Sequence, residues 1–397
     1  MIPDAGRARA GLFSAFAGLG VTAALVPAVL PAAERSIDAD LSSAVPVLFA
    51  GLLIGVLTSS PLLMRRPPQV ALILGGALQA AAIVGVALAA TPAVFIAAAA
   101  VAGFGFGLVE ASGSVAAKSV AVGSATGLLS ALLGTVAVCA AVTPLVVALG
   151  SGVRPALGIL ALVPLVSVAV FSVAMFSVAV FSDPMFSTSA PAAARTEAPS
   201  RRDARGLLVL LPFAVALPLY VGVETVLSGW SAVIPGRILA VDPGIAALGT
   251  SAFWTLMALG RFGAATLRRL AVPPTRILTT ATCVAAVLMA AAGLLVDRAP
   301  GWALGSLAAV VVLLAPSYGL ILGLALDRLD PARSAAVTGA LVACGAVGGT
   351  AIPTLILLIG RDPASETTFL VAAALCALVP LLVLVAARPP RPAAVPR

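Results

Sequence analysis

Apolar stretches of membrane-spanning length recur along the whole chain, and they constrain its fold more than any other feature. An α-helix needs about 20 such residues to cross the hydrocarbon core of a bilayer, whereas barrel strands would be short segments of alternating polarity. Hydrophobic residues make up 61% of the 397 positions and charged residues only 10%, which is a low charged share for a soluble protein. The sequence therefore predicts an all-α integral membrane protein.

Twelve of these stretches predict twelve membrane-spanning helices, with most charged residues in the loops between them. Their predicted bounds are 10–30, 41–63, 70–90, 93–117, 124–149, 155–181, 207–234, 244–267, 276–296, 302–325, 335–359 and 367–387. Prolines inside the seventh and tenth helices (Pro212, Pro218 and Pro316) are expected to kink them. The chain begins with basic residues before an apolar run, which we interpret as the first helix and not as a removable signal peptide.

The longest connection between predicted helices is SDPMFSTSAPAAARTEAPSRRDARG, residues 182–206. It is rich in proline, alanine, serine and arginine, so we expect a flexible cytoplasmic linker. The linker divides the chain into an N-terminal half (1–181) of six helices and a C-terminal half (207–397) of six helices with a short cytoplasmic tail.

The two halves also resemble each other in sequence. LLMRRPPQVALIL (62–74) compares with TLRRLAVPPTRIL (266–278), and TGLLSALLG (126–134) compares with TGALVACGA (338–346). An internal repeat of six plus six helices is typical of secondary transporters, which hold their solutes near the middle of the membrane, between the repeats.

Basic residues are distributed unevenly between the two sides of the predicted membrane. If both termini are cytoplasmic, eighteen arginines and lysines lie on the cytoplasmic side and five on the outer side. The outer five are Arg35, Arg154, Arg237, Arg298 and Arg361. This asymmetry follows the positive-inside rule, so we expect a protein of the cytoplasmic (inner) membrane with both termini inside. The net charge of +8 is then a topology signal and does not predict nucleic-acid binding.

Four stretches resemble the major facilitator superfamily and, within it, the fucose-permease-like proton symporters. They are GFGFGLVEASGS (103–114), YVGVETVLSGW (220–230), FWTLMALGRFGAATLRRL (253–270) and LALDRLDPARSAAVTGALVACGAVGGTAIP (324–353), similar to the family's fourth, seventh, eighth and tenth-to-eleventh helices. The resemblance implies two six-helix halves in the major facilitator fold and proton-coupled transport of a sugar or similar solute by alternating access. The chain departs from the superfamily pattern in GVLTSSPLLMRRPP, which lacks the usual loop aspartate, and in its first helix, which has no acid.

Only two acids, Glu110 and Glu224, lie inside predicted helices. A carboxylate at the bilayer centre costs roughly 2.5–3.5 kcal/mol, so it faces a cavity or a partner and is usually functional. Because the chain has no histidine, these two glutamates are the predicted proton-coupling residues, and both are also predicted to contact the solute. The alternative is that each is neutral and only hydrogen-bonds a neighbouring helix.

Helical spacing places other candidates near these acids. Glu110 shares a face with small residues, among them Gly103 and Gly107, which suits close packing or a cavity wall. Glu224 begins a polar stripe on its helix, and the resembled family lines its solute cavity with that helix. The predicted solute-binding residues are Gln79, Glu110, Tyr220, Glu224, Ser228, Trp230, Trp254 and Tyr318. The predicted gating residues are Arg261, Arg268 and Arg269.

Other function classes find little support in the sequence. The four cysteines lie in apolar segments, and no nucleophile–base pair or metal-ligand cluster is present, so we expect no enzyme, metal or cofactor. The expected partners are a small-molecule solute, protons and the lipid bilayer, and the expected state is a monomer. The solute class stays open, because a chain without asparagine offers few hydrogen-bonding side chains for a sugar. An amphiphilic solute, or export of a drug or secondary metabolite, is the alternative.

Overall fold

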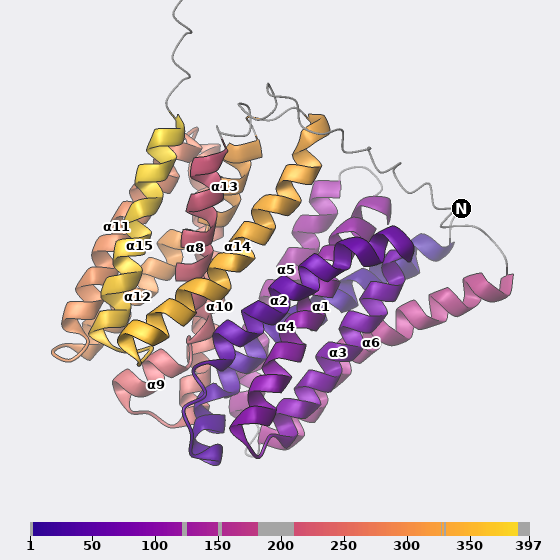
Figure 1. Ribbon diagram of the computed structural model, residues 1–397, viewed down its shortest axis with the longest axis horizontal. Coiled ribbons are helices and arrows are strands. Elements are labelled where there is room, and N and C mark those ends of the chain that lie inside the picture. Colours follow the sequence, from indigo (N-terminus) through magenta and orange to yellow (C-terminus); the bar gives the residue numbers. More distant parts are fainter. Residues whose placement is uncertain are drawn as a thin grey trace, which may run out of the picture.

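The computed structural model describes residues 3–120, 125–149, 153–181, 210–326, 328 and 331–387. Every regular element in these ranges is a helix, and the helices form one bundle with the two halves of the chain side by side (Figure 1). The predicted linker, 182–206, lies outside the described residues.

Six long helices form the N-terminal half: α1 (Pro3–Ile37), α2 (Ala44–Arg65), α3 (Pro68–Leu88), α4 (Pro92–Val120), α5 (Ala125–Leu149) and α6 (Val153–Phe181). Their bounds follow the predicted spans closely, except that α1 is much longer than expected. With 35 residues it extends to about 52 Å, whereas the hydrocarbon core is about 30 Å thick. The helix α1 is therefore longer than the hydrocarbon core is thick.

The described residues of the C-terminal half form eight helices: α8 (Leu211–Gly229), α9 (Val233–Leu239), α10 (Pro243–Arg269), α11 (Pro274–Leu295), α12 (Pro300–Leu314), α13 (Ser317–Leu326), α14 (Pro331–Gly360) and α15 (Glu366–Ala387). Many helices in both halves begin with proline, because the missing N–H is not needed at the first position.

Two spans that the sequence predicts as single kinked helices are broken in the structure. The seventh, 207–234, ends as α8 at Gly229 and resumes as the short α9. The tenth, 302–325, is divided into α12 and α13 by a turn at Ala315 and Pro316. Proline cannot donate the hydrogen bond that would continue α12, which explains a break at this position.

The structure confirms the expected membrane architecture. Among the described residues, eleven helical segments are long and apolar enough to cross a membrane, with α12 and α13 together forming one (Pro300–Ala325). The remaining predicted span is α6, on which a shorter apolar stretch, Leu157–Val173, is described. The chain is therefore an all-α, multi-pass membrane protein.

Close packing of α2 on α4 explains the small-residue face that carries Glu110. A Cβ atom at Gly103 would overlap the carbonyl oxygen of Leu48, and one at Gly107 would overlap that of Leu52. Glycines at these two positions bring the backbones of α2 and α4 together. This contact fixes the side of α4 from which Glu110 projects.

The two halves meet chiefly where α1 packs on α10, α2 on α14, and α5 on α10, and α1 also touches α8 and α9. We call the end of the bundle that carries α9 the α9 end, and the opposite end, where α1 begins and α15 ends, the terminal end (Figure 1).

Candidate functional site

The two intramembrane acids come from different halves and meet at one tyrosine. Tyr318, in the first turn of α13, interacts electrostatically with both Glu110 of α4 and Glu224 of α8. Both glutamates keep part of their surface accessible. Because Tyr318 belongs to the C-terminal half, Glu110 interacts electrostatically across the contact between the halves.

Glu224 has two further neighbours. It interacts electrostatically with Arg261 of α10, and its carboxyl group lies beside the hydroxyl of Tyr220, one helical turn away. The Tyr220 side chain is 1% exposed, and its hydroxyl also lies beside the backbone N–H of Tyr318. That hydroxyl has no partner with good hydrogen-bond geometry among the described groups.

Arg261 is positioned by the contact between α10 and α12. Its Nε donates to the carbonyl oxygen of Ala315 at 3.4 Å, at the break before α13. Arg261 is exposed, unlike Tyr220. No described side chain forms an ion pair with Glu110, so the two acids differ: Glu224 has an arginine nearby and Glu110 has only tyrosine.

The structure brings Glu110, Tyr220, Glu224, Tyr318 and Arg261 together, which we call the central cluster. Trp254 is partly buried and packs edge-to-face on Phe253, with ring centroids 5.6 Å apart. Ser228 is partly buried, and its carbonyl accepts the hydroxyl of Ser231 at 2.6 Å. No contact described for these residues joins them to the central cluster.

The other predicted site residues lie elsewhere or cannot be placed. Gln79 is buried in the N-terminal half beside Gly18, and neither polar atom of its amide has a partner among the described groups. The side chains of Arg268 and Arg269 lie outside the described part of the structure.

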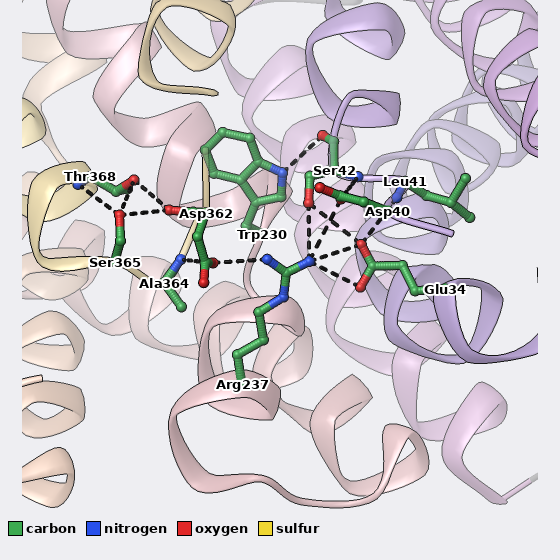
Figure 2. A network of polar contacts seen from close by, with 10 residues as sticks. All are labelled: Glu34, Asp40, Leu41, Ser42, Trp230, Arg237, Asp362, Ala364, Ser365 and Thr368. Atoms are coloured by element: carbon green, nitrogen blue, oxygen red, sulfur yellow. Dashed lines mark hydrogen bonds and ion pairs between the residues drawn. The ribbon is translucent and has the colours of Figure 1, made fainter. Parts of the chain in front are cut away.

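A second polar network joins the two halves at the α9 end (Figure 2). The Arg237 guanidinium on α9 pairs with Asp362 at 2.8 Å and with Glu34 at 3.1 Å. It also lies 3.7 Å from Asp40 and donates to the hydroxyl of Ser42 at 3.3 Å. One cation of the C-terminal half thus contacts three carboxylates, two of which belong to the N-terminal half.

Trp230 belongs to the same network. It is fully buried in the turn between α8 and α9, and its indole N–H donates to the carbonyl oxygen of Ser42 at 3.1 Å (Figure 2). The sequence predicts a solute contact for Trp230 because it follows the Glu224 stripe. The structure instead shows it bonded across the two halves at the α9 end, and the solute contact stays a prediction.

A second ion pair crosses the halves at this end with the roles reversed. Arg35 of α1 pairs with Asp242, just before α10, at 3.4 Å. Arg237 and Asp242 lie 202 residues after Arg35 and Asp40 respectively. Each aspartate accepts the backbone N–H two residues further on, at 2.9 Å in both cases. The internal repeat therefore supplies the same Arg–Asp unit twice, and each arginine reaches the aspartate of the other half.

The sequence predicts only that Arg35 and Arg237 lie on the outer side, and it does not predict this network. The signal that could have found it is the shared spacing, an arginine five residues before an aspartate at the same place in both repeats.

Charge and hydrogen bonding set the ionisation of the network. Burial raises the pKa of Asp40, but the hydrogen bonds from Ser42 and the charge of Arg237 outweigh it, so this pKa lies below its usual value. Burial lowers the pKa of Arg237, but the hydrogen bond to Asp362 and the charge of Glu34 outweigh it, so the net shift is upward. These pKa shifts keep Asp40 and Arg237 in their charged forms near neutral pH.

A hollow of about 490 Å³ opens beside Arg237 and is lined by both halves, with Glu34, Arg35, Asp38 and Asp40 on one side. Within the described residues, no group of three histidine, cysteine, aspartate or glutamate side chains could hold a metal ion.

The terminal end differs from the α9 end. Arg328 donates to the carbonyl of Ala386 at 2.9 Å and stacks on Phe213, all within the C-terminal half. Arg9 donates to the carbonyl of Val120 at 3.4 Å, within the N-terminal half. Among the described residues, the side-chain hydrogen bonds and ion pairs between halves all lie toward the α9 end.

No protein-family model matches the chain, and no curated protein is similar to it at a significant level. Solved structures do resemble it. The peptide transporter POT in complex with sulfate superposes with a TM-score of 0.72 at 15% identity, over 96% of this chain and 94% of that one. A D-xylose-proton symporter gives 0.71 at 15% identity, over 94% and 96%. A POT family transporter in complex with 5-aminolevulinic acid gives 0.72 at 12% identity, over 96% and 94%. These similarities confirm the expected major facilitator fold.

Proposed function

We propose that the protein is a proton-coupled secondary transporter that moves a small organic solute across the cytoplasmic membrane by alternating access. The observation that carries the proposal is the central cluster, in which one acid from each half approaches the same tyrosine. Carboxyl groups placed between two rocking halves can take a proton from one side of a membrane and release it to the other. The fold, shared with a D-xylose-proton symporter, supports the same conclusion.

Glu110 is the primary proton-coupling residue in this proposal, because no described basic side chain interacts with it, whereas Arg261 interacts with Glu224. Glu224 is the second proton-coupling residue. Its interaction with Arg261 couples its protonation to the charge of a residue in the C-terminal half.

We further propose that the α9 end is the outer end and that the network around Arg237 closes it. The proposal follows from the distribution of basic residues, which favours cytoplasmic termini. Alternating access requires the two halves to separate at this end. The bonds that Arg237, Arg35 and Trp230 each make to the other half then have to break. The state described here is accordingly closed to the outside, and we propose that the protein works as a monomer.

The test is transport in proteoliposomes under an imposed pH gradient, with labelled sugars and labelled amphiphiles as probes. Glu110→Gln is expected to reduce gradient-driven accumulation to the level seen without a gradient, while exchange of solute between equal pools continues. Glu366→Gln is the matched control, because this exposed glutamate lies in the first turn of α15, far from the cluster. Unchanged gradient-driven accumulation in Glu110→Gln would contradict the proposal.

A second candidate is an exporter of a drug or secondary metabolite. It is favoured by the composition of the chain, which has no asparagine and offers few side chains that could replace the water of a sugar. Whole cells separate the two candidates. Accumulation of a labelled sugar supports uptake, whereas increased resistance to amphiphilic compounds supports export.

A further inference from the structure

The break between α12 and α13 exposes the start of a helix inside the C-terminal half. The first backbone bond of α13 runs from the Leu320 N–H to the Pro316 carbonyl at 3.1 Å. The N–H groups before it, in the first turn, have no acceptor within their own helix. The start of a ten-residue helix such as α13 also carries partial positive charge.

Two hydroxyl groups at this break are buried, and neither makes a hydrogen bond of good geometry with a described group. Ser317, the first residue of α13, is 0% exposed, and its Oγ makes no hydrogen bond with a described group. The hydroxyl of Tyr220 comes from α8 and lies beside the Tyr318 N–H, so it is aimed at the same helix start. A buried hydroxyl without a partner is costly, which indicates that these groups serve a ligand.

A guanidinium reaches the break from a third helix. Arg261 of α10 uses its Nε on the Ala315 carbonyl, the last residue before Pro316. The groups that converge here are thus two hydroxyls, the free N–H groups of a helix start and a guanidinium. Such a set of donors fits an oxyanion, and a carboxylate already lies among them, that of Glu224.

We propose that the α12–α13 break, with Ser317, Tyr220 and Arg261, is the subsite for a carboxylate of the solute, and that the solute is a small organic acid. The inference rests on the proposed function, because it takes the central cluster to be the solute site. The two hydroxyls are covered in this state, so the carboxylate of the solute takes the position that Glu224 holds beside Tyr220. Arg261, unlike the two hydroxyls, is exposed.

Protonation of Glu224 would remove the negative charge of its carboxyl group. Arg261 and the start of α13 would then balance the negative charge of the solute carboxylate. The charged and titratable groups that interact with this cluster are Tyr220, Arg261, Tyr318 and, through Tyr318, Glu110. Helices α14 and α15 also pack against α8. Their described titratable side chains, on Cys344, Glu366 and Cys376, do not interact with Glu224.

The test measures binding to the purified full-length protein by thermal unfolding, with no proton gradient. Benzoate, benzyl alcohol and benzylamine share a ring and differ only in the polar group. We expect benzoate to raise the unfolding temperature in a concentration-dependent way and the other two probes to have little effect. The apparent benzoate affinity is expected to fall about tenfold in Ser317→Ala and in Tyr220→Phe, which is the size of one charge-assisted hydrogen bond.

Arg261→Gln is expected to lower the apparent affinity for benzoate further. Arg261→Lys is expected to retain part of that affinity because the positive charge remains. Thr280→Ala is the control, since this exposed threonine of α11 bonds only within its own helix. The subsite is overturned by equal shifts for the three probes, by no shift with benzoate, or by an undiminished benzoate shift in Ser317→Ala, Tyr220→Phe and Arg261→Gln together. Because no gradient is used, failure here leaves the Glu110→Gln result standing, and loss of proton coupling leaves benzoate binding standing.

Discussion

The two Arg–Asp pairs at the α9 end have the same local structure but different surroundings. Arg35 and Asp242 are 60% and 70% exposed and form one ion pair at 3.4 Å. Arg237 is 31% exposed and pairs with Glu34 and Asp362 as well as with Asp40. Exposed ion pairs contribute about 0–1 kcal/mol, whereas partly buried networks contribute more. The repeat thus supplies the geometry of the Arg–Asp pair, and the neighbouring residues set how much each pair contributes to stability.

The largest effect is expected from Arg237→Ala, which leaves three carboxylates at the contact between the halves without their cation. We expect it to lower the free energy of unfolding by about 2 kcal/mol, less than the 3–5 kcal/mol of a fully buried pair because Arg237 is partly exposed. Thermal unfolding of the purified variant measures it. Arg298→Ala is the control, since exposed Arg298 donates only to its own helix, at the Leu294 carbonyl. If the two variants lose the same free energy of unfolding, the Arg237 network contributes no more to stability than an exposed surface arginine.

A smaller effect is expected from Trp230→Phe, which keeps an aromatic ring but removes the donor to the Ser42 carbonyl. A buried carbonyl left without its partner costs about 1–3 kcal/mol, and we expect the lower part of that range. The same unfolding assay applies, with Trp302→Phe as the control because Trp302 is exposed. If Trp230→Phe is as stable as the wild type, the indole N–H does not hold the halves together.

Acid is expected to weaken the contact between Asp40 and Arg237. The folded pKa of Asp40 lies below its usual value, so its contribution is present at neutral pH and is lost as pH falls through the folded pKa. We expect the unfolding temperature of the wild type to fall more steeply than that of Asp40→Asn below about pH 4. Asparagine keeps an acceptor for the Ser42 N–H and cannot titrate. Parallel curves for the two proteins would show that Asp40 does not contribute.

The smallest effect is expected from Arg35→Ala. Its pair with Asp242 is exposed, so the loss should be below about 1 kcal/mol and should shrink further at high salt. Unfolding in low and high salt measures both. A loss as large as that of Arg237→Ala would contradict the view that surroundings set the strength of the two pairs.

Much of the fold could be predicted from the sequence, because apolar length and loop charge are local signals. The same is true of Glu110 and Glu224, whose cost in a membrane marks them without any knowledge of their neighbours. The break at Pro316 could not be told from a kink, since prolines occur inside intact helices here, such as Pro353 in α14.

The network around Arg237 could not be predicted for a different reason. Its partners are far apart in the chain: Arg237 and Glu34 are 203 residues apart, and Trp230 and Ser42 are 188 apart. A helical stripe shows which residues share a face but not what that face meets. The position of Trp230 depends on where α8 ends, which helical spacing does not determine.

The crossed Arg–Asp pairs also record the history of the chain. If the two halves arose from one six-helix protein, its homodimer would have had a two-fold axis, and a single arginine and a single aspartate would have formed both pairs. In such an ancestor every substitution changed both sides of the contact at once. Fusion of the two copies released that constraint. Glu34 faces Arg237, but its repeat counterpart, 202 residues later, is Gly236. Arg237 therefore has carboxylate partners, Glu34 and Asp362, that have no equivalent around Arg35 among the described ion pairs.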